Sequence, residues 1–236
     1  MNLFSVAILA GGLATRLRPI TENIPKSLIH VAGKPFIFHQ LDYLRNQGIR
    51  RVVLCTGYLG ELIQEEVGSG SRWGIDIFYS KDGPSLLGTG GAIRNAIPLL
   101  GDKFFVLYGD SYLPINFESV QNTFSKSGKP GLMTVLNNDN KWDTSNVIYS
   151  NGKIILYDKN KYTNGMSYID YGLGILSSDA FSIYSLNKIF DLADLYNRLS
   201  MTDQLAGYEV YNRFYEVGSH SGIAETESYL QGDIIK

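Results

Sequence analysis

The chain has 236 residues, of which 44% are hydrophobic and 19% are charged. This length and composition suit a folded domain with a substantial core, and they exclude a disordered or fibrous chain. The 21 basic and 23 acidic side chains give a formal net charge of -2, which argues against a general nucleic-acid or membrane-surface binder.

In chain order, the first half alternates between predicted strands and helices. The apolar run at 4–10 is typical of a strand buried on both faces, and it stops at Gly11 and Gly12. The same patterns predict helices at 34–47, 59–67 and 88–100, and strands at 49–57, 74–80 and 102–110. This alternation predicts a mostly parallel sheet with helices on both faces.

The second half is richer in predicted strands. Asn151 and Gly152 form a predicted tight hairpin turn inside 145–158. A late strand is expected at 208–219, followed by a short closing helix. No linker or repeat interrupts the chain, so we expect one domain, residues 1–236. Strands are also expected at 131–136 and 167–176, and a helix at 191–200.

No segment has the character of a targeting signal or a membrane span. The N-terminal residues lack a positive region and a cleavage site, and no apolar run approaches the roughly 18 residues that span a bilayer. The single cysteine, Cys55, allows no intrachain disulfide and lies in an apolar run, as a buried thiol does. We therefore expect a cytoplasmic protein without membrane partners.

Glycines and charges gather after the predicted strands. Ligands of open α/β sheets bind beyond the carboxyl ends of the strands, where Gly11, Gly12, Asp110 and Glu216 are expected. Glycines there turn backbone N–H groups toward an anion, and three nearby cations reinforce this. An ordinary turn with solvated charges is the alternative. The cations are Arg16, Arg18 and Lys26.

Several other chemistries lack their motifs. The Walker A pattern, the dinucleotide fingerprint G-x-G-x-x-G and the nucleophile elbow G-x-S-x-G are all absent. None of the three histidines has zinc-site spacing with another ligand. Asp110, at a strand end, is suited to bind a hard divalent cation through oxygen, or it caps a helix.

Residues 9–35, LAGGLATRLRPITENIPKSLIHVAGKP, resemble the signature loop of sugar-1-phosphate nucleotidyltransferases, GG-x-x-TRL-x-P-x-T-x-x-x-PK-x-L. PSLLGTGGAIRNA at 84–96 and VLYGDSYL at 106–113 are similar to two further family segments, and LYDKNK, YIDYGLGIL and FYEVGSHSGIAE match later ones more loosely. The resemblance covers essentially the whole chain. It is closest to short bacterial members such as heptose-1-phosphate guanylyltransferases and N-acetylmuramate-1-phosphate uridylyltransferases.

This resemblance implies a Rossmann-like three-layer α/β sandwich with a mostly parallel mixed sheet, the nucleotidyltransferase or GT-A-like fold. It implies transfer of a nucleoside monophosphate from an NTP to a sugar 1-phosphate, with release of pyrophosphate. The product, an NDP-sugar, would serve surface polysaccharide or glycan precursor synthesis. Mg²⁺ is the implied cofactor. Because two polyanions must meet, catalysis should rest on positioning and positive charge.

The resemblance also implies roles for individual residues. Arg16 should hold the β- and γ-phosphates, Lys26 the α-phosphate, and Asp110 and Glu216 the Mg²⁺; the family usually has Asp where Glu216 stands. Lys159 should contact the sugar phosphate, with Lys161 as its competitor. Asp170 and Gly172 belong to the sugar side. The implied nucleotide contacts are Leu9, Ala10, Gly11, Gly12, Arg16, Lys26, Asp82, Gly88 and Asp110.

Three alternatives remain open at this point. A cytidylyltransferase for a non-sugar phosphate such as phosphocholine shares the N-terminal loop. A non-catalytic regulatory homologue would tend to lose the cations or the metal-binding Asp, which are present here. A glycosyltransferase using Gly109-Asp110-Ser111 as its metal motif conflicts with the signature loop. The sequence does not decide between a monomer and a homodimer.

Overall fold

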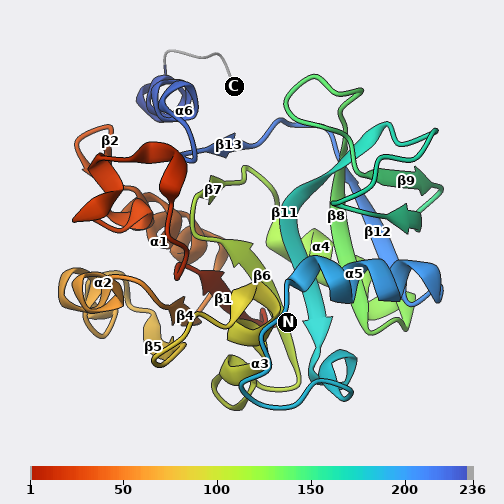
Figure 1. Cartoon of the computed structure of the whole chain (residues 1–236), viewed down its shortest axis with the longest axis horizontal. Coiled ribbons are helices and arrows are strands. Elements are labelled where there is room, and N and C mark those ends of the chain that lie inside the picture. The colour runs from red at the N-terminus through yellow and green to blue at the C-terminus, as the bar shows by residue number, and fades with distance from the viewer. Residues whose placement is uncertain (1, 233–236) are drawn as a thin grey trace.

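A computed structural model describes residues 2–232, and its centre is a nine-stranded mixed sheet (Figure 1). From one edge to the other, the strands follow in the order β5 (Asp76–Lys81), β4 (Arg51–Thr56), β1 (Ser5–Leu9), β6 (Lys103–Tyr108), β11 (Tyr168–Ser177), β8 (Gly131–Asn137), β12 (Leu205–Val210), β10 (Lys153–Tyr157) and β9 (Val147–Ser150).

Strand β1 lies between β4 and β6 and pairs in parallel with both. Its alternate side chains enter two different cores, with Val6 and Ile8 on one face and Ala7 on the other. This confirms the prediction of a strand buried on both faces. Because β1, β4 and β6 are parallel, their carboxyl ends share one edge of the sheet, where ligands of such sheets bind.

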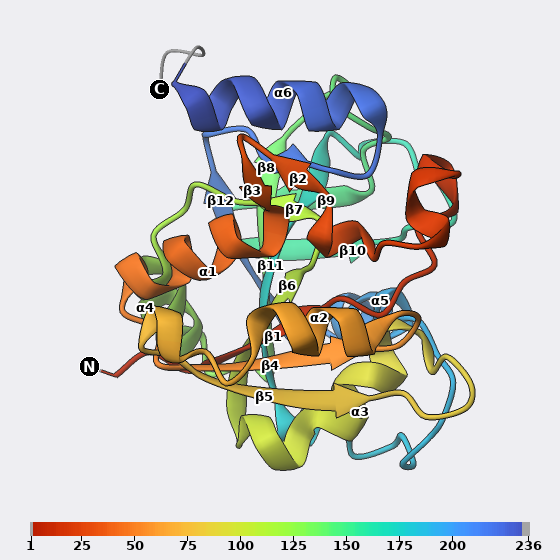
Figure 2. The same ribbon diagram turned by 90° about the vertical axis from the view of Figure 1, so that its left-hand side faces the viewer.

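Helices cover both faces of the sheet, which gives the three layers that Figure 2 shows edge-on. Helices α1 (Phe36–Gln47), α2 (Gly60–Val67) and α4 (Phe117–Ser127) pack on one face, and α3 (Gly88–Leu100) and α5 (Leu192–Met201) pack on the other. The predicted α/β sandwich is therefore confirmed. Helix α4, whose apolar side chains join the first core, was not among the predicted helices.

The predicted late strand at 208–219 is not continuous, since only 208–210 and 215–216 are in strands. The chain leaves the large sheet after β12 and forms β13 (Tyr215–Glu216), which pairs antiparallel with β7 (Ser111–Tyr112) in a separate ribbon. The closing helix, α6 (His220–Gln231), is also not short, since its 12 residues match α1. Tyr215 stacks on Tyr229 of α6 at 4.0 Å between ring centroids, so β13 packs against α6.

Two local predictions can be compared residue by residue. The helix expected at 34–47 begins two residues later, because Lys34–Pro35 forms β3, which pairs with β2 (His30–Val31). The turn between β9 and β10 has φ of 48° at Asn151 and 80° at Gly152, as a tight hairpin requires. Within residues 2–232, none of the helices has the length and apolar character that crossing a bilayer would demand.

Candidate active site

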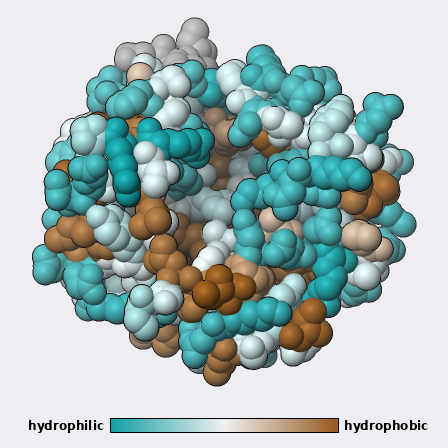
Figure 3. All heavy atoms as spheres, viewed as in Figure 1, coloured by the Kyte–Doolittle hydropathy of each residue, from teal (hydrophilic) through white to brown (hydrophobic). Residues whose placement is uncertain are grey.

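Two cavities lie at the carboxyl edge of the sheet and meet at Tyr108 and Asp110, which line both. The first, of about 250 Å³, is lined by the ends of β1 and β6 and the start of α3. The second, of about 490 Å³, is lined by the 142–146 loop and parts of β10, β11 and β13. In Figure 3 the face that carries this edge is hollowed at its centre.

The structure groups the predicted site residues with one exception. All predicted sugar-side residues and both predicted metal ligands line the second cavity. The exception is Arg16, which was expected with the nucleotide contacts but lines the second cavity. Its neighbour Leu17 is fully buried, whereas Arg16 is exposed. The predicted residues around the first cavity are Leu9, Ala10, Gly11, Gly12, Lys26, Asp82, Gly88 and Asp110.

Two glycines let the end of β1 approach its neighbours. A Cβ on Gly11 would lie 2.9 Å from the Gly57 nitrogen, and one on Gly109 would lie 2.7 Å from the Leu9 carbonyl oxygen. Both distances are too short for any other residue, so the backbone here is packed as tightly as glycine permits. A Cβ on Gly12, by contrast, would meet nothing within 4 Å. The backbone at Gly12 therefore borders open space.

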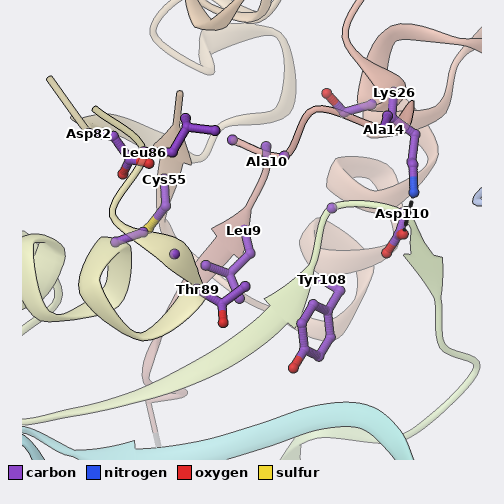
Figure 4. A pocket seen from close by; sticks show the side chains of 16 residues that line it. Leu9, Ala10, Ala14, Lys26, Cys55, Asp82, Leu86, Thr89, Tyr108 and Asp110 are labelled. Carbon is purple, nitrogen blue, oxygen red and sulfur yellow. Dashed lines mark hydrogen bonds and ion pairs between the residues drawn. The ribbon is translucent and has the colours of Figure 1, made fainter. Parts of the chain in front are cut away.

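The signature loop folds as short 3₁₀ turns, at Thr15–Leu17, Ile20–Glu22 and Lys26–Leu28. The last turn brings Lys26 over the end of β6, where its Nζ lies 2.8 Å from Oδ2 of Asp110 (Figure 4). Both side chains are mostly buried, with relative exposures of 18% and 28%. A partly buried lysine with one carboxylate partner keeps two further N–H donors for an anion.

The β7–β13 ribbon brings Glu216 to Asp110. Glu216 pairs with Ser111, and the Val217 N–H donates to the Asp110 carbonyl oxygen at 2.9 Å. The Glu216 carboxylate accepts hydrogen bonds from the Gly218 N–H at 2.5 Å and from the Ser219 hydroxyl at 3.0 Å. Asp110 and Glu216 therefore lie on two segments that are distant in sequence. Backbone hydrogen bonds between these segments hold them side by side.

The donor set near Asp110 can be tested against Mg²⁺. Within residues 2–232, no group of three or more His, Cys, Asp or Glu side chains forms a metal site. Mg²⁺ does not need one, because it commonly binds one or two carboxylates and takes its other ligands from water and substrate phosphates. Asp110 and Glu216 both line the second cavity and offer only oxygen. The pair fits Mg²⁺ delivered with a phosphate substrate.

Gly88 begins α3 at the wall of the first cavity. The resemblance implied a nucleotide contact at Gly88, and the structure shows a separate constraint on this position. Gly88 has φ of 71°, and a Cβ there would lie 2.6 Å from the Phe190 carbonyl oxygen. Packing against the segment before α5 therefore requires glycine at this position, whether or not a base contacts it.

Asp170 lies where strand β11 is irregular. Its pairing with β8 shifts register between Asp170 and Gly174, and Gly172 has φ of 101°. Such a bulge re-aims side chains, and here it presents Asp170 and Gly172 to the second cavity. Burial raises the pKa of Asp170 to about 6, against the opposing effects of the Gly172 N–H and of Lys159.

Lys159 belongs to a network that joins the two cavities. Its Nζ lies 2.8 Å from Oδ2 of Asp191, whose Oδ1 accepts from the Thr89 hydroxyl at 2.8 Å and from the Ala193 N–H at 3.0 Å. Asp191 thereby caps α5 and links the first-cavity residue Thr89 to the second-cavity residue Lys159. The competitor Lys161 is exposed and lines neither cavity.

Several residues in or beside the two cavities were not predicted from the sequence. Ser27 is 3% exposed, lines the first cavity, and its hydroxyl has no hydrogen-bond partner among the described residues. Its place beside Lys26 in the signature loop was the only available signal. Trp142 lines the second cavity, and the Arg213 guanidinium lies 3.8 Å from its ring centroid. Asp191 and Thr89 carried no pattern that marked them as a pair.

Comparisons with known proteins place this geometry in a family. The profile of the family described as nucleotidyl transferase matches residues 5–149. A D-glycero-alpha-D-manno-heptose 1-phosphate guanylyltransferase from Campylobacter jejuni is 30% identical over 187 residues, which cover 79% of this chain and 82% of that relative. The N-acetylmuramate alpha-1-phosphate uridylyltransferase of Neisseria meningitidis serogroup B is 40% identical over 119 residues.

The alignment with the uridylyltransferase covers 50% of this chain and spans about half, 52%, of that relative's length. Among solved structures, HddC from Yersinia pseudotuberculosis is similar with a TM-score of 0.81 and 25% identity, over 97% of this chain and 100% of that chain. Both cavities thus belong to a fold shared over nearly the whole length of the chain.

Proposed function

Because the chain belongs to the nucleotidyl transferase family, we propose that it transfers a nucleoside monophosphate from a nucleoside triphosphate to a sugar 1-phosphate. Family membership confirms what the signature loop indicated. Relatives carry the names of sugar-1-phosphate uridylyl-, guanylyl- and thymidylyltransferases. The observation that carries the proposal is the Lys26–Asp110 pair at the point where the two cavities meet.

In this proposal the first cavity holds the nucleotide. The backbone at Gly11 and Gly12 and the Lys26 ammonium face the phosphates, and the Ser27 hydroxyl is a further donor. Lys26 offsets the charge that builds up on the α-phosphorus as the sugar phosphate oxygen attacks and pyrophosphate leaves. Arg16 lines the neighbouring cavity, and from there its guanidinium reaches toward the phosphates that are leaving or attacking.

Asp110 and Glu216 would hold Mg²⁺ beside the α-phosphate. The ion would supply charge neutralisation where the two polyanions meet. Lys26 donates to one oxygen of Asp110 at 2.8 Å, so the ammonium and the carboxylate would both lie where the phosphates and the cation meet.

The second cavity holds the sugar 1-phosphate. Lys159 is placed to bind its phosphate, and Asp170 accepts hydrogen bonds from sugar hydroxyls. We propose a neutral, hydroxyl-rich sugar, because acidic side chains outnumber basic ones in this cavity and would repel a carboxylate on the substrate. Apart from Asp110 and Glu216, whose charge the proposed Mg²⁺ would offset, the acidic lining residues are Asp143, Asp158 and Asp170, and the basic ones are Arg16 and Lys159.

Three other expectations from the sequence stay predictions. They are a single domain over residues 1–236, a cytoplasmic location, and a monomer or homodimer. A cytidylyltransferase acting on phosphocholine stays the second candidate, because aromatic rings and an excess of acidic side chains in the second cavity suit a quaternary ammonium. Against it, Lys159 and Asp170, the residues that the resemblance assigns to the sugar side, both line this cavity.

The proposal is tested by pyrophosphate release. The four common nucleoside triphosphates are each combined with neutral sugar 1-phosphates, N-acetylmuramate 1-phosphate and phosphocholine. We expect release with a neutral sugar 1-phosphate and its loss when a chelator removes Mg²⁺. Release that needs no acceptor, or that occurs with phosphocholine alone, would contradict the proposal. A preference for N-acetylmuramate 1-phosphate would contradict only the neutral sugar.

A further inference from the structure

The two ends of the first cavity differ in chemistry. Figure 4 shows Lys26 and Asp110 at one end and Asp82, Leu86 and Cys55 at the other. The end near Lys26 carries the cation, and the opposite end has apolar walls and one carboxylate. If the phosphates lie at the cationic end, as proposed above, the nucleobase lies at the end that contains Asp82.

Asp82 is held in place by its backbone and by one side-chain bond. It follows the last residue of β5, and its N–H donates to the Thr56 carbonyl oxygen at 3.0 Å. Its Oδ2 accepts from the Leu87 N–H at 3.2 Å. Among the described residues no basic side chain pairs with this carboxylate, and its Oδ1 accepts no hydrogen bond.

Resting on the proposed function, we propose that Asp82 selects guanine, so that the nucleotide substrate is GTP. An ionised carboxylate only accepts hydrogen bonds, and its two oxygens match two adjacent donors. On its Watson–Crick edge guanine presents such a pair, the N1–H and the N2 amino group. The base would lie between Leu86 and Ala10, with its donor edge toward Asp82.

The other common bases fail the same geometric test. Uracil and thymine present one N–H between two carbonyl oxygens, which a carboxylate repels. Adenine and cytosine present an amino group beside a ring nitrogen that accepts, so one carboxylate oxygen faces a lone pair. A partly buried polar group left without a partner disfavours these bases more strongly than a missing apolar contact would.

A purely structural role for Asp82 makes a different prediction. The Leu87 N–H needs only one acceptor, which asparagine also supplies, so Asp82→Asn would then leave nucleotide preference unchanged. Burial raises the pKa of Asp82, which means that the cavity disfavours its charge. Without a ligand, an asparagine amide at position 82 would accept the Leu87 hydrogen bond without the cost of burying a charge. A carboxylate is the better group only if a ligand donates hydrogen bonds to it.

The test compares the binding of GTP, ITP and UTP by calorimetry, with Mg²⁺ and without acceptor. ITP keeps the N1–H of guanine but lacks the N2 amino group. The variants are Asp82→Ala and Asp82→Asn. Asp76→Asn is the matched control, because Asp76 begins the same strand, is exposed and lines neither cavity. Thermal unfolding of each variant shows whether it is folded.

We expect the wild type and Asp76→Asn to bind GTP roughly 10- to 100-fold more tightly than ITP, the range for a hydrogen bond to a charged group. UTP should bind more weakly than GTP, and the GTP-to-ITP ratio should fall close to one in both Asp82 variants. UTP binding as tightly as GTP, or a ratio that Asp82 does not affect, would overturn the inference and leave the proposed function standing. If no triphosphate binds, the proposed function fails and the inference fails with it.

Discussion

The two cavities that meet at Asp110 are built by different means. The first is lined mainly by backbone and small residues from the parallel half of the sheet, at the ends of β1 and β6. The second is lined mainly by side chains from loops and irregular strands of the other half, and most of these are polar or aromatic. Backbone N–H groups can hold an anion without any particular side chain, whereas side chains decide which ligand fits.

This difference teaches how one fold can keep a reaction and change its substrates. Cβ atoms at Gly11 and Gly109 would collide with neighbouring backbone, so the first cavity has little freedom to vary. In the second cavity, Trp142 and Lys159 project from segments outside the closely packed core. We therefore expect substitutions at the Lys26 end of the first cavity to affect turnover, and those in the second cavity to affect recognition of the acceptor.

The largest effect is expected in the first cavity. Lys26→Ala should lower kcat by roughly 10²- to 10³-fold, the usual cost of removing one donor that stabilises transition-state charge. The measurement is pyrophosphate release at saturating substrates. Lys34→Ala is the control, because Lys34 lies nearby, makes an ion pair with Asp42 and lines neither cavity.

If Lys26→Ala is folded by circular dichroism and turns over at a near-normal rate, the first cavity does not govern turnover as proposed. A loss of folding would be a separate result. Lys26 is paired with the Asp110 carboxylate, and a partly buried charge left alone is destabilising. Lys26→Met, which keeps the apolar stem, separates packing from charge.

The first cavity was also the part that the sequence predicted well. Its residues come from continuous segments, in which a buried strand ends at Gly11 and Gly12 or at Gly109. Strand periodicity and glycine position are local signals, and they place a residue at the end of a strand without knowledge of the strand order. Arg16 was expected beside the first cavity but lines the second, because the direction of a side chain in a 3₁₀ turn cannot be read from its spacing alone.

The second cavity could be predicted only in part, because its arrangement depends on contacts between distant segments. Glu216 reaches Asp110 through a two-residue ribbon, which is too short to show a period. Asp191 forms hydrogen bonds with Lys159 and Thr89, which are distant in sequence, and no sequence spacing predicts these contacts. The bulge at Asp170 follows from pairing with β8, which a single strand does not reveal.

A second prediction concerns Lys159. Lys159→Ala should raise the KM for the sugar 1-phosphate roughly 10- to 100-fold, as expected for a lost charge-assisted hydrogen bond. The KM for the triphosphate should stay unchanged. Lys161→Ala is the matched control, since Lys161 lies two residues further and is exposed. A rise in this KM for Lys161→Ala but not for Lys159→Ala would assign the phosphate contact to Lys161. If Lys159→Ala raised the KM for the triphosphate as much as that for the sugar 1-phosphate, the two cavities would not be separate in function.

The smallest expected effect is a pH dependence confined to the second cavity. Burial raises the pKa of Asp170 to about 6 from its ordinary value of 3.8. If the carboxylate accepts hydrogen bonds from sugar hydroxyls, kcat/KM for the sugar 1-phosphate falls as the pH is lowered through about 6. The substrate phosphate also titrates near this pH, so the wild type is compared with Asp170→Asn. The variant should have a lower kcat/KM at neutral pH, and its pH profile should contain one ionisation fewer than that of the wild type.

The same pKa fixes the sign of an independent stability measurement. Between about pH 4 and pH 6 the folded state holds the Asp170 proton that the unfolded state releases, so this group destabilises the fold as the pH rises through that window. Asp170→Asn should therefore gain in unfolding midpoint relative to the wild type at pH 7.5, and the gain should shrink toward pH 4. A gain that is constant with pH would mean that Asp170 does not titrate there, and the fall in kcat/KM would then belong to the substrate alone.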